Sequence, residues 1–144
     1  MAYGCWRVTG VIHHPPIDEE HEKKSHESIK AAFDAGYTLF DLSDVDSDGL
    51  VEEVFGRTLK EVSGMRDRIV IATKCGIREK GDPDKDAPHR YDLSKEYITR
   101  SCDASLKRMG VDCIDLYQLH RPDYLMEQDE IAAAFESLRQ AGKV

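Results

Sequence analysis

Three short apolar runs in this sequence each end directly before a side chain that can take part in chemistry. The runs and the residues that follow them are 37–40 with Asp41, 69–73 with Lys74 and 113–119 with His120. Each run has the length and composition of a β-strand, and a helical pattern follows each of them. Alternating strands and helices favour a parallel sheet, in which the carboxyl ends of the strands meet at one edge. We therefore expect an acid, a base and an imidazole to converge there.

The alternation runs through the whole chain. Strands are expected at 2–8, 37–41, 69–74 and 113–119, and helices at 18–35, 51–62, 94–110 and 128–140. The fold class is therefore α/β, and reactive side chains at several strand ends are typical of a (β/α)8 TIM barrel. A full barrel needs roughly 250 residues, so this chain of 144 residues is predicted to hold about the first four β/α units. Residues 1–144 would then be one incomplete domain, from a fragment of a longer protein or a truncated gene product; the alternative is a complete, small open α/β sheet.

A long charged loop at 76–91 separates the third expected strand from the helix that follows it. A loop of this length at the functional edge is more often a lid or a substrate loop than a linker. Ser94 after the loop is a good helix N-cap, and Leu93 and Ile98 flank it in the positions of a hydrophobic staple.

Charge and cysteine content exclude several classes of protein. The net charge of −8 disfavours a nucleic-acid partner. No apolar run approaches the roughly 18 residues of a membrane span, and no signal peptide opens the chain. The four cysteines form no CxxC pair and have no zinc spacing, so we interpret them as reduced packing residues of a cytosolic (cytoplasmic) protein. They are Cys5, Cys75, Cys102 and Cys113.

The alternation of side chains along each strand tests the expected convergence. The residues that share a face are Leu39 with Asp41, Ala72 with Lys74, and Gln118 with His120. All three reactive side chains can therefore point to the barrel axis together. Taken singly, a turn-capping Asp41, a solvated Lys74 and a loop residue His120 are the simpler interpretations. Three such residues at equivalent strand ends favour an active site.

Several motifs in the chain resemble those of the aldo-keto reductases. The segments that carry the resemblance are 40–44 (FDLSD), 71–76 (IATKCG), 91–101 (YDLSKEYITRS), 104–108 (ASLKR), 116–123 (LYQLHRPD) and 141–144 (AGKV). The resemblance implies a β/α barrel in which an NAD(P)H-dependent oxidoreductase, expected to use NADPH, reduces a small aldehyde or ketone substrate to an alcohol. The net charge and the lack of a long apolar run predict neither a nucleic-acid partner nor a membrane.

Such a site uses an aspartate, a tyrosine, a lysine and a histidine, of which Asp41, Lys74 and His120 match three by motif. Asp46 stands at the tyrosine position, five residues after Asp41. Beside Lys74, Asp46 is expected to be ionised, because a cation lowers the pKa of a carboxyl group further. It would then accept a hydrogen bond from the lysine, and losing the general acid would cost about a hundred- to ten-thousand-fold in rate.

The resemblance also implies that most contacts to the phosphates and adenine of the cofactor come from the second half of the barrel. In this chain we expect only the nicotinamide end to be held, by Asp41 and the strand end at Trp6, so NADPH binding would be weak or absent. A competing interpretation is a non-catalytic, degenerate half-barrel that acts by self-association, or by partner binding, through its open edges.

Residues 44–49 also match the opening of an EF-hand calcium loop, with oxygen-bearing side chains at positions one, three and five and then a glycine. Phe55 replaces the glutamate of position twelve, so calcium affinity would be weak. His13, His14, His21 and His26 suggest a metal site at first sight, but their spacing does not place them on one helix face. We expect no metal site there.

Overall fold

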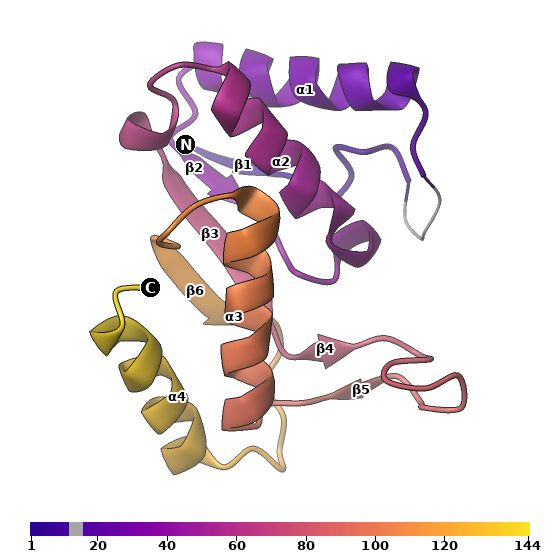
Figure 1. The fold of residues 1–144 in the computed structure, drawn as a ribbon, viewed down its shortest axis with the longest axis vertical. Helices are drawn as coiled ribbons and strands as arrows, with labels where there is room; N and C mark the ends of the chain where they lie inside the picture. The colour runs from indigo at the N-terminus through magenta and orange to yellow at the C-terminus, as the bar shows by residue number, and fades with distance from the viewer. Residues whose placement is uncertain (12–15) are drawn as a thin grey trace.

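The computed structural model describes residues 1–11 and 16–144. Its main sheet has four parallel strands in the order β1-β2-β3-β6, and each strand lies beside its neighbour in the chain. These strands are β1 (Ala2–Gly4), β2 (Leu39–Asp41), β3 (Val70–Cys75) and β6 (Leu116–Leu119). The α-helices that alternate with them are α1 (Glu19–Asp34), α2 (Leu50–Glu61), α3 (Lys95–Met109) and α4 (Gln128–Gln140). This succession is the predicted series of β/α units (Figure 1).

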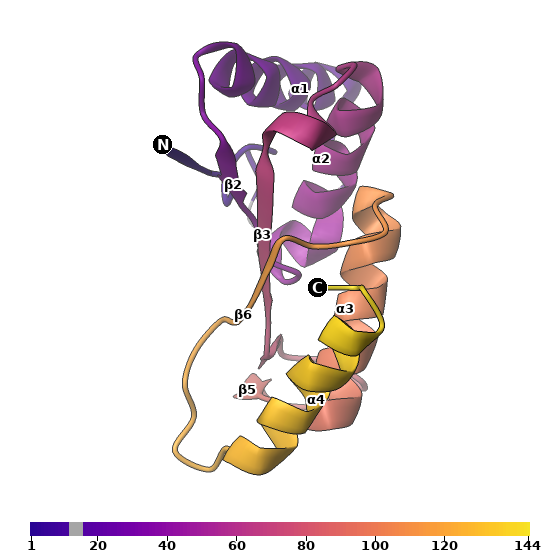
Figure 2. The same ribbon diagram turned by 90° about the vertical axis from the view of Figure 1, so that its left-hand side faces the viewer.

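The helices cover one face of the main sheet and leave the other face open (Figure 2). On the covered face, Phe40 and Ile71 are fully buried against Phe55 of α2 and Ile98 of α3. On the open face, Val70 and Leu116 are 40% and 41% exposed. Closed barrels fill this inner face with side chains from all eight strands.

The helix boundaries follow the capping signals in the sequence. The Asp18 carboxylate accepts a hydrogen bond from His21 N at the start of α1, and the Ser94 hydroxyl accepts one from Tyr97 N at the start of α3. Gly110 ends α3 in the left-handed conformation, which costs a glycine little. α4 has the predicted bounds.

Three strands are shorter than predicted, and the strand expected at 37–41 begins only at Leu39. β1 ends at Gly4 because the next residues turn, with Val8 N donating to Cys5 O and Gly10 N to Arg7 O. β6 begins three residues after its expected start at 113, because Asp115 forms its hydrogen bond to β3 through its side chain and not through its backbone. Its Oδ2 accepts from Ile71 N at 2.8 Å.

The long charged loop contains a short antiparallel hairpin that the sequence did not predict. Its strands are β4 (Ile77–Arg78) and β5 (Arg90–Tyr91). Arg78 holds the hairpin together by ion pairs to Asp82 at 2.7 Å and Asp92 at 3.0 Å. The ion pair to Asp92 therefore attaches the loop to the segment that leads into α3.

All four cysteines are free, as expected, and only Cys113 is partly exposed. Burial raises the pKa of Cys5, Cys75 and Cys102 to about 12, so these thiols stay protonated and act as packing groups. In residues 1–11 and 16–144, no helix is long and apolar enough to cross a membrane. His13 and His14, considered above for a metal site, lie outside the described residues.

Candidate active site

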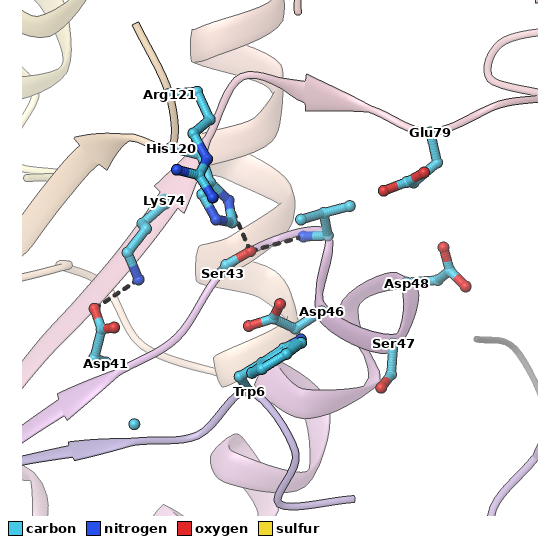
Figure 3. A pocket seen from close by; sticks show the side chains of 12 residues that line it. Trp6, Asp41, Ser43, Asp46, Ser47, Asp48, Lys74, Glu79, His120 and Arg121 are labelled. Atoms are coloured by element: carbon cyan, nitrogen blue, oxygen red, sulfur yellow. Dashed lines mark hydrogen bonds and ion pairs between the residues drawn. The ribbon is translucent and has the colours of Figure 1, made fainter. Parts of the chain in front are cut away.

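A pocket of about 480 Å³ opens at the carboxyl ends of β2, β3 and β6. It contains every residue that the sequence analysis assigned to the site (Figure 3). Its lining residues are Gly4, Trp6, Asp41, Ser43, Val45, Asp46, Ser47, Asp48, Lys74, Glu79, His120 and Arg121. The three strand-end residues therefore converge, as the alternation along their strands predicted.

Lys74 and Asp41 form an ion pair across neighbouring strands. The Lys74 Nζ atom lies 2.6 Å from Asp41 Oδ1 and also donates to Leu42 O at 2.8 Å. Thr73 and Cys75, on either side of Lys74, are buried on the helix-covered face, so alternation along β3 sends the lysine into the pocket. The ammonium group is thus held by two oxygen acceptors, one at the end of β2 and one directly after it.

His120 lies at the end of β6, and its Nδ1 atom is 3.2 Å from Ser43 Oγ. Burial lowers the pKa of His120, and the nearby cations Lys74 and Arg121 lower it further. The imidazole is therefore neutral at pH 7. Val45 N donates to the same hydroxyl oxygen, so the hydroxyl proton is available to His120 Nδ1 and the Nε2–H form suits the pocket.

Asp46 begins the short 3₁₀ helix η1 (Asp46–Gly49), which follows the β2 strand end. Burial raises its pKa to about 6, and repulsion by Glu52 and Asp41 acts in the same direction, against opposing contributions from Lys74 and Ser43. The expected lowering of this pKa was wrong. Within the described residues Lys74 forms its ion pair with Asp41 and none with Asp46, because the strand-end partner is already in place.

The backbone around Asp46 is fixed by polar contacts from the following residue. Ser47 and Asp48 both have left-handed backbone angles, with φ of 47° and 56°, an arrangement that non-glycine residues rarely adopt. The Ser47 hydroxyl donates to Val11 O at 2.7 Å and lies 3.2 Å from Thr9 Oγ1. These contacts hold the turn that presents Asp46 to the pocket.

The calcium interpretation of 44–49 receives no support from this arrangement. The hydroxyl of Ser47 is directed to Val11 and Thr9. In the part of the chain that the structure describes, no group of three or more His, Cys, Asp or Glu side chains is placed to hold a metal ion.

A buried polar network lies on the other side of β3, and the sequence analysis missed it. Glu52 of α2 is fully buried, accepts from Thr73 Oγ1 at 2.6 Å, and pairs with Arg108 of α3 at 2.7 Å. Asp44 lies beside this network, and burial and the charge of Glu52 raise its pKa to about 7. The position of Glu52 among the apolar residues of α2 was the signal that could have revealed it.

Three further residues complete the pocket wall. Trp6 is 57% exposed, and the Arg7 guanidinium lies 4.4 Å from its ring centroid. Glu79 comes from the hairpin loop, and Arg121 follows His120. Of these three residues, only Trp6 was predicted to belong to the site. Glu79 and Arg121 lie in loops, whose course the alternation of side chains along a strand does not predict.

The aldo/keto reductase family model matches residues 1–144, which is the whole chain. The chain belongs to the aldo-keto reductase family. It is 34% identical to the 6-dehydroglucose reductase of Agrobacterium fabrum and 36% identical to the aldo-keto reductase YhdN of Bacillus subtilis, each over 100% of this chain. The alignments cover 47% and 40% of those proteins, so the chain spans less than half the length of the aldo-keto reductases it matches.

Solved structures show the same relationship. A Bacillus halodurans aldo-keto reductase in its holo form superposes with a TM-score of 0.80 at 32% identity, covering 99% of this chain and 42% of that one. The glycerol dehydrogenase of Gluconobacter oxydans gives 0.82 at 32% identity, covering 99% and 41%. The four β/α units therefore correspond to the N-terminal half of an aldo-keto reductase (β/α)8 barrel, as predicted.

Proposed function

We propose that this chain supplies the catalytic strand ends of an aldo-keto reductase that reduces a small aldehyde or ketone with NADPH. The observation that supports it is one pocket in which Lys74, paired with Asp41, lies with the neutral His120. A fixed cation and a neutral imidazole are the groups that polarise and orient a carbonyl oxygen.

Each residue has a role in this proposal. The Nε2–H of His120 donates to the carbonyl oxygen and orients it. Lys74, held by Asp41, provides positive charge where negative charge develops on that oxygen. The product is the alcohol, formed when hydride adds to the carbonyl carbon and a proton adds to the oxygen.

The pocket fits the nicotinamide end of the cofactor. At Gly4 no atom lies within 4 Å of where a Cβ would be, and Trp6 offers an exposed ring at the pocket wall. These two residues and Asp41 would hold the nicotinamide, which supplies the hydride when bound. Among the described residues, the cations of the lining are Lys74 and Arg121, so the phosphates are expected to need contacts outside this pocket.

The proposed substrate is a small, hydroxylated carbonyl compound. Two proteins similar to this chain are named for related compounds: a 6-dehydroglucose reductase, for a dehydrosugar, and a glycerol dehydrogenase, for a polyol whose oxidation gives a hydroxylated carbonyl compound. The carboxylate and hydroxyl groups of this pocket wall, among them Ser43 and Glu79, are acceptors for substrate hydroxyls. The four free cysteines support a reducing compartment such as the cytoplasm.

The test is NADPH oxidation with a panel of small aldehydes and hydroxyketones. It is run with this chain alone and with a barrel completed by the second half of YhdN, which aligns with the chain over 144 residues. Lys74→Met is the negative control. Carbonyl-dependent oxidation that Lys74→Met abolishes supports the proposal, and an equal rate in that variant contradicts it.

A non-catalytic role by self-association is the second candidate, because Val70 and Leu116 are exposed on the open sheet face. An associated chain that neither binds NADPH nor reduces any carbonyl, even in the completed barrel, would favour this alternative.

A further inference from the structure

The carboxyl group of Asp46 lies in the same pocket as Lys74 and His120. In Figure 3 the Asp46 side chain lies between the Trp6 ring and Ser43, inside the pocket. An acidic side chain is thus placed among the residues that would surround the substrate.

We propose that Asp46, as a neutral carboxylic acid, is the proton donor for carbonyl reduction in this pocket. This inference rests on the proposed function and names the group that completes it.

The first support is the pairing pattern around the pocket. Lys74, the cation that favours the charged form of Asp46, is occupied by Asp41 at 2.6 Å and by Leu42 O at 2.8 Å. Among the described residues Asp46 has no ion pair, so its carboxyl group is not locked in the charged form. A neutral carboxyl group can donate its proton, which a salt-bridged carboxylate cannot.

The second support is the rigidity of its backbone. The buried Ser47 next to it is anchored to Val11 O and Thr9, and the Asp46 main-chain N donates to Ser43 O. A donor held by its neighbours loses little freedom when the substrate arrives, and this lowers the barrier for proton transfer.

The third support is electrostatic. Burial is the largest cause that raises the pKa of Asp46 to about 6, and a catalytic pKa close to the working pH is the most effective. The charged and titratable groups around it come from every neighbouring element. They are Asp41 and Asp44 at and after the end of β2, Asp48 and Glu52 at η1 and α2, Lys74 on β3, Glu79 in the hairpin loop, and His120 and Arg121 after β6.

The step balances without any further reactant. A bound reduced nicotinamide would supply the hydride that forms the C–H bond at the carbonyl carbon as the carbon–oxygen π bond breaks. The electron pair moves to the oxygen, which takes the proton of the Asp46 carboxyl group. The products are the alcohol, the oxidised cofactor and the Asp46 carboxylate, which regains a proton from water.

His120 is the other acid near the substrate, and its environment argues against that role. Burial favours the neutral form of both groups: with Lys74 and Arg121 it lowers the pKa of His120, and it raises the pKa of Asp46. His120 is therefore assigned the orienting hydrogen bond and Asp46 the proton.

The first experiment measures the proton directly on this chain. Carboxyl ¹³C signals of aspartate are followed by NMR from pH 3.5 to 8.5, and the signal absent from Asp46→Asn is assigned to Asp46. A midpoint near 6 supports the inference. A midpoint at or below 4 overturns it, because the group would then be a carboxylate at every working pH.

The second experiment measures carbonyl reduction in the completed barrel, with the unmodified chain and with the Asp46→Asn and Asp46→Tyr variants. In the unmodified barrel, kcat/KM is expected to fall about tenfold per pH unit above 6, and Asp46→Asn to lower it by at least about a hundredfold and to remove this pH dependence. Reduction by Asp46→Tyr but not by the unmodified barrel overturns this inference and leaves the proposed function standing. No reduction by either protein overturns both.

Discussion

The ammonium group of Lys74 reaches Oδ1 of Asp41 across two neighbouring strands, at 2.6 Å. Register places Asp41 opposite Ala72 of β3, so the lysine bridges diagonally to β2. The pair is partly open to solvent, with the Lys74 and Asp41 side chains 21% and 40% exposed. Its contribution to the free energy of unfolding is therefore small, about 1 kcal/mol or less, and its main effect is to orient the ammonium group.

The Asp41→Asn variant should lose carbonyl reduction without losing stability. Without the carboxylate, Lys74 keeps its hydrogen bond to Leu42 O but loses its charged partner and can shift, and misplacing a positioned group by about 1 Å costs on the order of a hundredfold in rate. We expect kcat/KM to fall by that factor in the completed barrel, with an almost unchanged urea midpoint. Lys143→Met is the matched control, because Lys143 also forms a 2.6 Å ion pair, to Asp103, but away from the pocket. An equal loss of rate in both variants would contradict the assignment.

Removing the partner of the buried Glu52 should destabilise the fold. Arg108→Met leaves the fully buried carboxylate with only Thr73, among the described residues, as a side-chain hydrogen-bond donor. Breaking a buried pair on one side costs about 3–5 kcal/mol, and we expect the lower end because Arg108 is 22% exposed. Urea unfolding measures the change. Arg139→Met is the control, because it removes a surface ion pair to Glu136 and should leave the urea midpoint unchanged. Equal shifts of the midpoint in the two variants would show that the buried ion pair stabilises the fold no more than the surface pair does.

Local signals were sufficient to predict most of this fold. Ser94 caps its helix as expected, and the period of the apolar residues placed α4 within its observed bounds. Strand ends were harder, because they depend on residues far away in the chain. Asp115 replaces a strand contact by accepting from Ile71 N, and the alternation of side chains contains no sign of this.

The site shows the same division between local and distant information. Alternation along β3 was enough to bring Lys74 to the pocket. The pKa of Asp46 was predicted in the wrong direction, because its value depends on burial and on Glu52, which neither spacing nor strand parity reveals.

The buried carboxyl group of Asp44 should make the protein more stable at mildly acidic pH. Burial raises its pKa to about 7 from the ordinary 3.8, so between roughly pH 4 and 7 the native state keeps a proton that the unfolded chain releases. The free energy of unfolding therefore falls as pH rises through this window, by about 2–4 kcal/mol for this group.

Urea unfolding of Asp44→Asn and of the unmodified protein at pH 4.5 and 7.5 tests this dependence. The asparagine cannot titrate, so the loss of stability between the two pH values should shrink. Asp112→Asn is the control, because Asp112 is exposed, and it should leave the dependence intact. Parallel pH dependences in the unmodified protein and Asp44→Asn would rule out a protonated Asp44.

The open sheet face should drive association of the isolated chain. Val70 and Leu116 are 40% and 41% exposed on adjacent strands, and apolar groups on an uncovered sheet attract a second surface. We expect light scattering to show dimers or larger species at high protein concentration. Leu116→Lys should reduce them, whereas Ala133→Lys, which adds the same charge on the exposed side of α4, should not. A cooperatively folded monomer at all concentrations would contradict this expectation.

The isolated chain should bind NADPH only weakly. Within the described residues the pocket lining offers Lys74 and Arg121 as cations, Lys74 is already paired with Asp41, and the sequence has no glycine-rich phosphate loop. A few contacts at the nicotinamide end must offset several kcal/mol of lost translational and rotational freedom, so we expect a Kd of about 1 mM or weaker, a binding free energy near −4 kcal/mol.

Trp6 is the single tryptophan and lines the pocket, so quenching of its fluorescence reports NADPH binding, with calorimetry as the check. The fluorescence signal should vanish in Trp6→Phe, and the affinity of this variant, measured by calorimetry, should be no higher than that of the unmodified chain. A micromolar Kd would mean that two copies complete one site or that these residues bind the phosphates themselves, and light scattering with and without NADPH would distinguish the two.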